Sequence, residues 1–163
     1  MGELQEDLEA VIAVGVDVLP RFEAVADVEF VSGDARTLPF ADASFDLTTI
    51  MTVLSSIPES ASRRTVLAEC LRVTRHGGTL LIYDFVLKNP LNKYTHPVSA
   101  KEIRESVRGA ATVKVERVTL NPIIARLVFA TRIPWARLIC EHLSRVPFLC
   151  HHILVRAVKV APA

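Results

Sequence analysis

Neither positive nor negative residues predominate in this sequence, and its apolar stretches are repeatedly interrupted. Its 163 residues carry 19 Lys and Arg against 18 Asp and Glu, a formal net charge of +1. This balance gives no overall field that would attract nucleic acid, so no nucleic-acid partner is expected. Apolar stretches such as residues 121–139 are interrupted, here by Arg126, Arg132 and Pro134, and none is expected to span a bilayer.

Cysteine is also scarce, and its placement argues against two classes of protein. The three cysteines, Cys70, Cys140 and Cys150, are an odd number and lie far apart in apolar segments. We therefore expect reduced core thiols rather than a disulfide framework, and no metal site. The N-terminal sequence MGELQEDLEAV carries four acidic residues and no basic one, the reverse of a secretory or transit signal. A cytosolic protein is predicted.

Glycine is rare in the first part of the chain, where only Gly2 and Gly15 precede Gly33. The GxGxxG turn that holds the pyrophosphate of a dinucleotide is therefore lacking, which argues against a nicotinamide-dependent oxidoreductase.

What the sequence does contain is an alternation of strand and helix patterns in a chain of one-domain length. Half of the residues are apolar. Short β-branched and apolar runs predict strands, and 3.6-residue periodicity and a Ser99/Glu102 capping box predict helices. The expected strands are 12–17, 28–33, 45–53, 79–85, 112–120 and 151–160, and the main expected helices are 4–11, 61–75 (closed by Gly77-Gly78) and 99–109. This order predicts an α/β fold with a mostly parallel sheet covered on both faces.

Polar side chains follow the predicted strands where ligands bind in such sheets, outside the carboxyl ends. Asp17 ends the first of these strands, and we expect its carboxylate to accept hydrogen bonds from the two hydroxyls of a ribose. Asp34 follows the next strand and suits the amino group of an adenine, while Leu38 and Phe40 offer apolar cover for the ring. The stretch SGDARTLPFADASFDL is therefore interpreted as an adenine pocket.

The stretches VGVD, VEFVSGDARTLPFADASFDL and LAECLRVTRHGGTLLIYDF together resemble the class I S-adenosylmethionine-dependent methyltransferases that act on small molecules. The resemblance covers residues 12 to 160 and implies a Rossmann-like sheet with an antiparallel last strand and S-adenosyl-L-methionine as cofactor. It also implies a ribose contact at Asp17, adenine contacts at Asp34 and Ala35, apolar cover from Leu38, and an acceptor side at residues 83–85. The implied activity is methyl transfer to an unidentified small molecule.

The resemblance leaves out the family's first strand and its glycine-rich loop, so residues 1–163 are interpreted as one N-terminally truncated domain. In the family's sheet the missing strand lies between the strand ending at Asp17 and strand 45–53. We expect this gap to be closed either by direct pairing of the two strands or by another chain, for example in a homodimer. The chain by itself is expected to bind the cofactor weakly, and the alternative is a non-catalytic remnant or interaction module.

No catalytic residue is assigned from the sequence. Asp84 is either an acceptor-side base or an exposed turn residue, and His96 lies in a loop near the expected acceptor. His151 and His152 are expected at the start of an edge strand. Residues 133–149, which are rich in apolar side chains and arginine, are expected to pack in the core or to form a substrate lid. The alternative for this segment is a helix lying on a membrane surface.

Overall fold

The computed structural model describes residues 12–19, 28–88 and 92–161. The predicted helix 4–11 lies outside these residues. The described elements are β1 (Ala13–Asp17), β2 (Val28–Ser32), β3 (Phe45–Met51), η1 (Leu54–Ser56), α1 (Ser60–Val73), β4 (Thr74–Phe85), α2 (Ala100–Ser106), β5 (Ala111–Leu120), α3 (Pro122–Ala130), α4 (Ala136–Leu143), η2 (Pro147–Leu149) and β6 (Cys150–Lys159).

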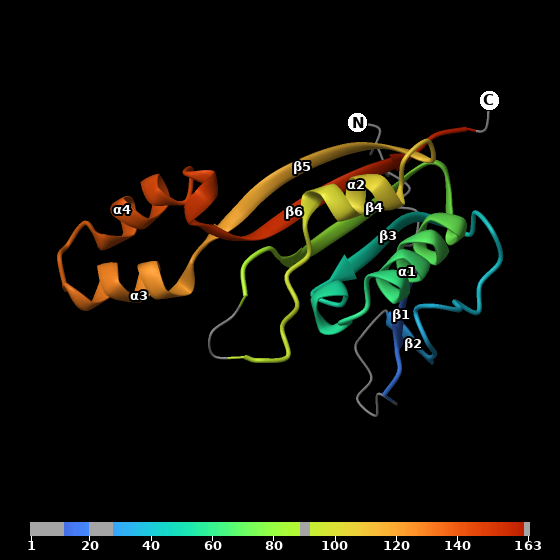
Figure 1. The fold of residues 1–163 in the computed structure, drawn as a ribbon, viewed down its shortest axis with the longest axis horizontal. Coiled ribbons are helices and arrows are strands. Elements are labelled where there is room, and N and C mark those ends of the chain that lie inside the picture. The colour runs from blue at the N-terminus through green and yellow to red at the C-terminus, as the bar shows by residue number, and fades with distance from the viewer. Residues whose placement is uncertain (1–11, 20–27, 89–91, 162–163) are drawn as a thin grey trace, which may run out of the picture.

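The strands form two sheets with parallel and antiparallel pairings, as Figure 1 shows. β1 and β2 pair in parallel, and a second sheet has the order β3-β4-β6-β5. β3 and β4 are parallel, whereas β6 runs antiparallel to both β4 and β5. The antiparallel last strand is therefore confirmed, but β6 is central, so the expectation of an edge strand for His151 and His152 was wrong.

Direct pairing of β1 with β3, one of the two expected ways of closing the gap, is not found among the described residues. The two strands belong to different sheets, because β1 pairs with β2 and β3 pairs with β4.

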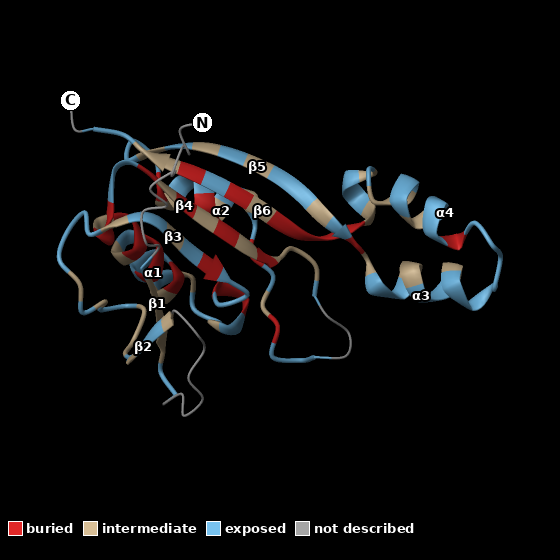
Figure 2. Cartoon of the chain, turned by 180° about the vertical axis from the view of Figure 1, so that it is seen from behind, coloured by how far each residue is buried: buried red, intermediate tan, exposed pale blue. Residues whose placement is uncertain are grey.

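The core lies between the β3-β4-β6-β5 sheet and the helices α1 and α2, which cover one of its faces (Figure 1). Its central side chains alternate along β4 and β6 and meet the apolar stripe of α1, as period-2 and period-3.6 patterns require. They include Leu80, Ile82, Ile153, Val155, Val66 and Leu67, all less than 2% exposed. Helices were expected on both faces, but within residues 12–19, 28–88 and 92–161 no helix covers the opposite face (Figure 2). Leu47 and Met51 of β3 are accordingly about half exposed.

Helix α1 ends at Val73 and passes directly into β4, four residues before the predicted stop at Gly77-Gly78. The Thr74 hydroxyl donates to the Cys70 carbonyl oxygen at 2.6 Å, which satisfies one acceptor of the last helical turn. The glycines serve the strand instead. Gly77 has a φ of +76°, and a Cβ atom on Gly78 would lie 2.8 Å from the Asp46 carbonyl oxygen.

The cysteines are all free, as expected. Cys70 and Cys150 are buried, and burial raises the pKa of the Cys70 thiol to about 12, which keeps it protonated. Cys140 lies half-buried on α4, not in the core.

Residues 121–149, named here the helical arm, join the end of β5 to the start of β6. The arm contains α3 and α4, which pack against each other at the far end of the β5–β6 ribbon, away from α1 and α2 (Figure 1). α3 has no buried residue and α4 has only Ala136. The expectation of core packing for residues 133–149 was therefore wrong. None of the helices that the structure describes is long and apolar enough to cross a membrane.

Candidate functional site

The carboxyl ends of β1 and β2 bring Asp17 and the Gly33-Asp34 turn to one edge. Asp17 is in register with Ser32, and the Gly33 N–H donates to the Asp17 carbonyl oxygen at 3.0 Å. The Asp17 carboxylate also accepts from the Leu19 N–H at 3.1 Å, which fixes it at the turn after the strand. Two carboxylates that sequence reasoning proposed for one ligand therefore lie at the same end of the same small sheet.

Asp34 is engaged by Arg36 two residues later. Arg36 Nη2 lies 2.6 Å from Asp34 Oδ2, and the Arg36 Nε and backbone N–H both donate to Asp34 Oδ1. These hydrogen bonds hold the pKa of the Asp34 carboxyl below its ordinary value, so the group is ionised at neutral pH. A ligand that bonds to Asp34 would have to share the carboxylate with Arg36 or replace it.

Ala35 and Leu38 pack against the hydrophobic core, and the Phe40 ring meets Phe45 edge to face at 5.0 Å. The loop is fixed from α1, since the Leu38 N–H donates to Glu69 Oε2 at 2.9 Å and Arg72 donates to the carbonyl oxygens of Leu38 and Phe40. Sequence reasoning missed this role of Glu69 and Arg72, although both fall on the loop-facing side of the predicted helix.

The second part of the site lies where β3 and β4 end. The Thr52 N–H donates to the Tyr83 carbonyl oxygen at 2.8 Å. Asp84 is fully buried, so its interpretation as an exposed turn residue was wrong. Its carboxylate accepts from the backbone N–H groups of Ser55, at 3.2 Å, and Phe85, at 2.8 Å, and thereby fixes η1 against the end of β4.

His96 is brought to the same place, as its backbone N–H donates to the Ser55 carbonyl oxygen at 2.8 Å. The loop of residues 92–98 therefore borders the end of β4, and contact of His96 with an acceptor stays a prediction.

Two buried imidazoles complete this region. The His152 ring stacks on Tyr83 with a centroid distance of 4.6 Å and also contacts Phe85 at 4.2 Å, and His151 meets Phe85 edge to face. Within the part of the chain that the structure describes, the Nδ1 atoms of His151 and His152 have no hydrogen-bond partner. Burial lowers the pKa of both imidazoles, so both are neutral at pH 7. The sequence shows two adjacent histidines in a predicted strand. Their contacts with Tyr83 and Phe85 depend on the pairing of β6 with β4, which the sequence does not show.

A family model described as "Methyltransferase domain" matches residues 2–82, about half of the chain. The chain belongs to the methyltransferase family. Its match to a demethylmenaquinone methyltransferase of Renibacterium salmoninarum is 48% identical over 59 residues, which is 36% of this chain and 24% of that protein. The chain thus spans about a quarter of the length of this curated relative.

Two solved structures support the fold of this methyltransferase. The YcgJ protein of Bacillus subtilis matches with a TM-score of 0.63 at 16% identity, over 91% of this chain and 82% of that one. The N-methyltransferase NodS of Bradyrhizobium japonicum, solved in complex with S-adenosyl-L-homocysteine, matches with a TM-score of 0.58 at 14% identity, over 91% and 66%. The Rossmann-like fold predicted from sequence is confirmed, and S-adenosylmethionine is the family's cofactor.

The Asp17 carboxylate has the acceptor chemistry that the ribose end of this cofactor requires. The Leu19 N–H donates to one of its oxygens, and a carboxylate has about four acceptor positions in all. An adenine amino group can reach Asp34 only when Arg36 turns away, because Arg36 donates hydrogen bonds to both oxygens of Asp34.

Proposed function

We propose that this methyltransferase transfers a methyl group from S-adenosylmethionine to an apolar, ring-containing small molecule that carries hydroxyl groups. The observation that carries the proposal is the pair of carboxylates, Asp17 and Asp34, at adjacent strand ends of a methyltransferase sheet. The demethylmenaquinone acceptor in the name of the matched relative supports the acceptor class. Because the three cysteines are free, a reducing compartment suits the chain, and we place it in the cytosol.

In this proposal the residues of the first edge bind the cofactor. The Asp17 carboxylate accepts hydrogen bonds from the ribose hydroxyls, and Asp34 with the backbone of Ala35 contacts the adenine amino group after Arg36 has turned away. Leu38 provides apolar contact to the ring, on a loop that Glu69 and Arg72 hold to α1. S-adenosylmethionine, when bound, supplies a methyl group activated by the positive charge on its sulfur.

The acceptor side is placed at the aromatic cluster at the end of β4, which consists of the half-buried Tyr83 and Phe85 and the buried His152. An aromatic ring would pack against Tyr83, Phe85 and His152, where the His152 ring stacks on Tyr83 and lies tilted against Phe85. A hydroxyl-bearing ring becomes a stronger nucleophile when it loses a proton, and the neutral His152 is a suitable acceptor for that proton. In this role His152 would take up the proton that the acceptor loses, and the bound cofactor would supply the methyl group that replaces it.

The second candidate function is that of a non-catalytic module. It is favoured by the separation of β1 from β3, since the strand ends that carry Asp17 and Thr52 are not joined by hydrogen bonds among the described residues. Such a module would retain ligand contacts at one edge without aligning the two substrates.

Saturation-transfer NMR of the full chain with S-adenosylhomocysteine, S-adenosylmethionine or NADH tests the cofactor, because it detects weak binding. We expect a signal from each adenosyl ligand, and we expect each of the two to reduce the signal of the other by competition. NADH should give a weaker signal. Preference for NADH would contradict the assignment. Adding a reduced demethylnaphthoquinone and measuring S-adenosylhomocysteine by mass spectrometry then separates the two functions, since binding without product supports the non-catalytic module.

A further inference from the structure

We propose that the helical arm docks on the surface of an anionic lipid bilayer. The proposal does not depend on the methyl acceptor or on cofactor binding. It rests on the exposure, the pattern and the charge of residues 121–149.

The arm exposes large apolar side chains to an unusual extent. Phe148 is 73% exposed, Trp135 and Leu127 are each 65% exposed, and Phe129 and Leu138 are each 55% exposed. Leaving so many large apolar groups in water along one short segment is unfavourable and marks surfaces that contact a partner or a membrane. The arm lies beyond the body of the sheet in Figures 1 and 2, so neither α1 nor α2 covers it.

The apolar groups on α4 are arranged on one side of the helix. Trp135, Leu138, Ile139 and His142 recur at the spacing i, i+3, i+4 and i+7, and together with Ile133 and Leu143 they line one shallow hollow. Arg137 and Glu141, which are four residues apart, form an ion pair of 3.0 Å away from this stripe. An apolar stripe with a charged opposite side is the arrangement that lies in the plane of a membrane interface.

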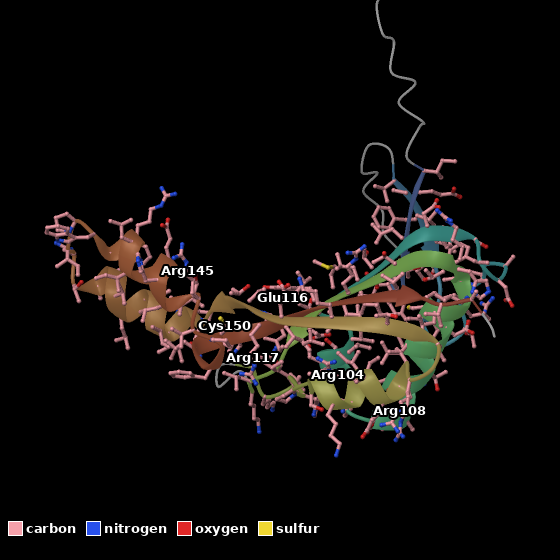
Figure 3. All side chains as sticks on the ribbon, turned by 90° about the horizontal axis from the view of Figure 1, so that it is seen from above. Arg104, Arg108, Glu116, Arg117, Arg145 and Cys150 are labelled. Carbon is pink, nitrogen blue, oxygen red and sulfur yellow. The ribbon has the colours of Figure 1, made fainter. Side chains whose placement is uncertain are left out.

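The charge of the arm favours an anionic surface over other occupants. The arm contains a single acidic residue, Glu141, and four arginines, Arg126, Arg132, Arg137 and Arg145. Its formal charge is therefore +3, and that of the rest of the chain is −2. Figure 3 labels Arg145 on the arm and Cys150 at the start of β6, where the arm ends. Arginine side chains bury their stems in the interface while the guanidinium stays near lipid phosphates. A second copy of the arm would instead bring two sets of arginines together.

Docking would place the base of the arm, and with it the start of β6, next to the bilayer. His152 lies two residues after Cys150, and its ring contacts Tyr83 and Phe85 at the end of β4. The arm therefore joins a membrane-facing surface to the aromatic cluster by a short path along the chain.

Trp135 is the only tryptophan of the chain, so its fluorescence reports on the arm alone. The full chain is titrated with vesicles of phosphatidylcholine, or of phosphatidylcholine with 30% phosphatidylglycerol, and bound protein is also measured by flotation. We expect the emission to shift to shorter wavelength and to be quenched by brominated acyl chains with the anionic vesicles only. Unchanged emission, or equal binding to neutral vesicles, would overturn the proposal.

Matched variants separate the charge from the apolar contact. Arg126→Gln with Arg145→Gln should weaken binding to anionic vesicles about 30-fold, since each arginine near such a surface contributes about fivefold. The control, Arg104→Gln with Arg108→Gln, removes an exposed arginine of α2 and one that follows it, both outside the arm (Figure 3), and should leave binding unchanged. Equal effects of both pairs would contradict docking through the arm.

The apolar contact is tested by Phe148→Ser against Tyr94→Ser, because the two aromatic side chains are 73% and 70% exposed and neither is in the core. Only Phe148→Ser should reduce binding. Analytical ultracentrifugation without lipid distinguishes the competing occupant: a dimer that Phe148→Ser dissociates would assign the arm to a second copy and overturn the proposal.

Discussion

The Leu38 N–H donates to Glu69 Oε2 at 2.9 Å, joining the loop after β2 to the third turn of α1 across 31 residues of sequence. Arg72 completes the connection. Its Nε and Nη2 donate to the two Glu69 oxygens at 2.8 and 2.9 Å, and its Nη2 also donates to the Leu38 carbonyl oxygen at 3.0 Å. One forked ion pair therefore holds both backbone groups of Leu38, which no lysine could do with a single nitrogen.

Glu69→Ala should destabilise the protein, because it leaves the Leu38 N–H without its acceptor and removes the partner of Arg72. Loss of hydrogen bonds to a charged group predicts a decrease of about 2 kcal/mol in the free energy of unfolding. Urea denaturation followed by circular dichroism measures it. Glu105→Ala, which removes a half-exposed glutamate of α2, serves as the control and should change stability little. Similar stability of the two variants would contradict the structural role of Glu69.

The contribution of Glu69 should disappear in acid. Hydrogen bonds from Arg72 lower the pKa of the Glu69 carboxyl below 4.5, its ordinary value. A carboxyl with a lowered pKa in the folded state stabilises the fold above the unfolded-state pKa, and this contribution is lost as the pH falls through the lower folded-state value. The stability difference between the wild type and Glu69→Gln should be present at pH 7 and decrease steadily below pH 4.5. A constant difference would show that charge is not involved.

Much of the fold could be predicted from the sequence because its signals are local. Alternating apolar residues in 79–85 and 151–160 predict β4 and β6, and the Ser99 side chain does accept from the Glu102 N–H as its capping box predicts. The predicted end of helix α1 at Gly77-Gly78 was wrong, because glycine occurs both at helix ends and where strands approach closely. Only the contact of Gly78 with the Asp46 carbonyl oxygen across the sheet identifies the second case.

The site was less predictable, because its chemistry depends on pairings between distant segments. Asp17 and Asp34 could be placed at strand ends from sequence order alone. Their present partners, Leu19 and Arg36, are local but depend on turn geometry. Asp84 was left open between two interpretations since nothing in YDF shows that its carboxylate meets the backbone of Ser55. The His152 stack on Tyr83 joins residues 69 positions apart and needed the register of β4 and β6.

The buried histidines predict a loss of stability in mild acid. Burial lowers the pKa of His151 and His152 below 6.5, so each takes up a proton more readily when the chain unfolds. The fold is then fully stabilised above pH 6.5, and this stability is lost as the pH falls below that value. His152→Phe, which retains a ring against Tyr83, should reduce the proton uptake on unfolding by up to one proton between pH 5 and 6.5. His142→Gln, which removes an exposed imidazole of α4 outside this cluster, is the control.

The role proposed for Asp17 is tested by its effect on adenosyl ligands. Asp17→Ala removes the acceptor for two ribose hydroxyls, and hydrogen bonds to a charged group predict a loss of about 1.5–3 kcal/mol, or roughly 10- to 150-fold in affinity. Because β1 and β3 belong to separate sheets among the described residues, we expect the wild type itself to bind S-adenosylhomocysteine with a Kd weaker than about 1 mM. NMR titration detects such weak binding by the wild type, and a loss of this size should leave Asp17→Ala with no detectable binding. Asp46→Ala, an exposed strand carboxylate paired with Arg75, is the control and should retain the wild-type affinity. Equal affinity of wild type and Asp17→Ala would mean that the carboxylate only caps the turn at Leu19, and micromolar binding by the wild type would show that the separated strands already form a complete cofactor site.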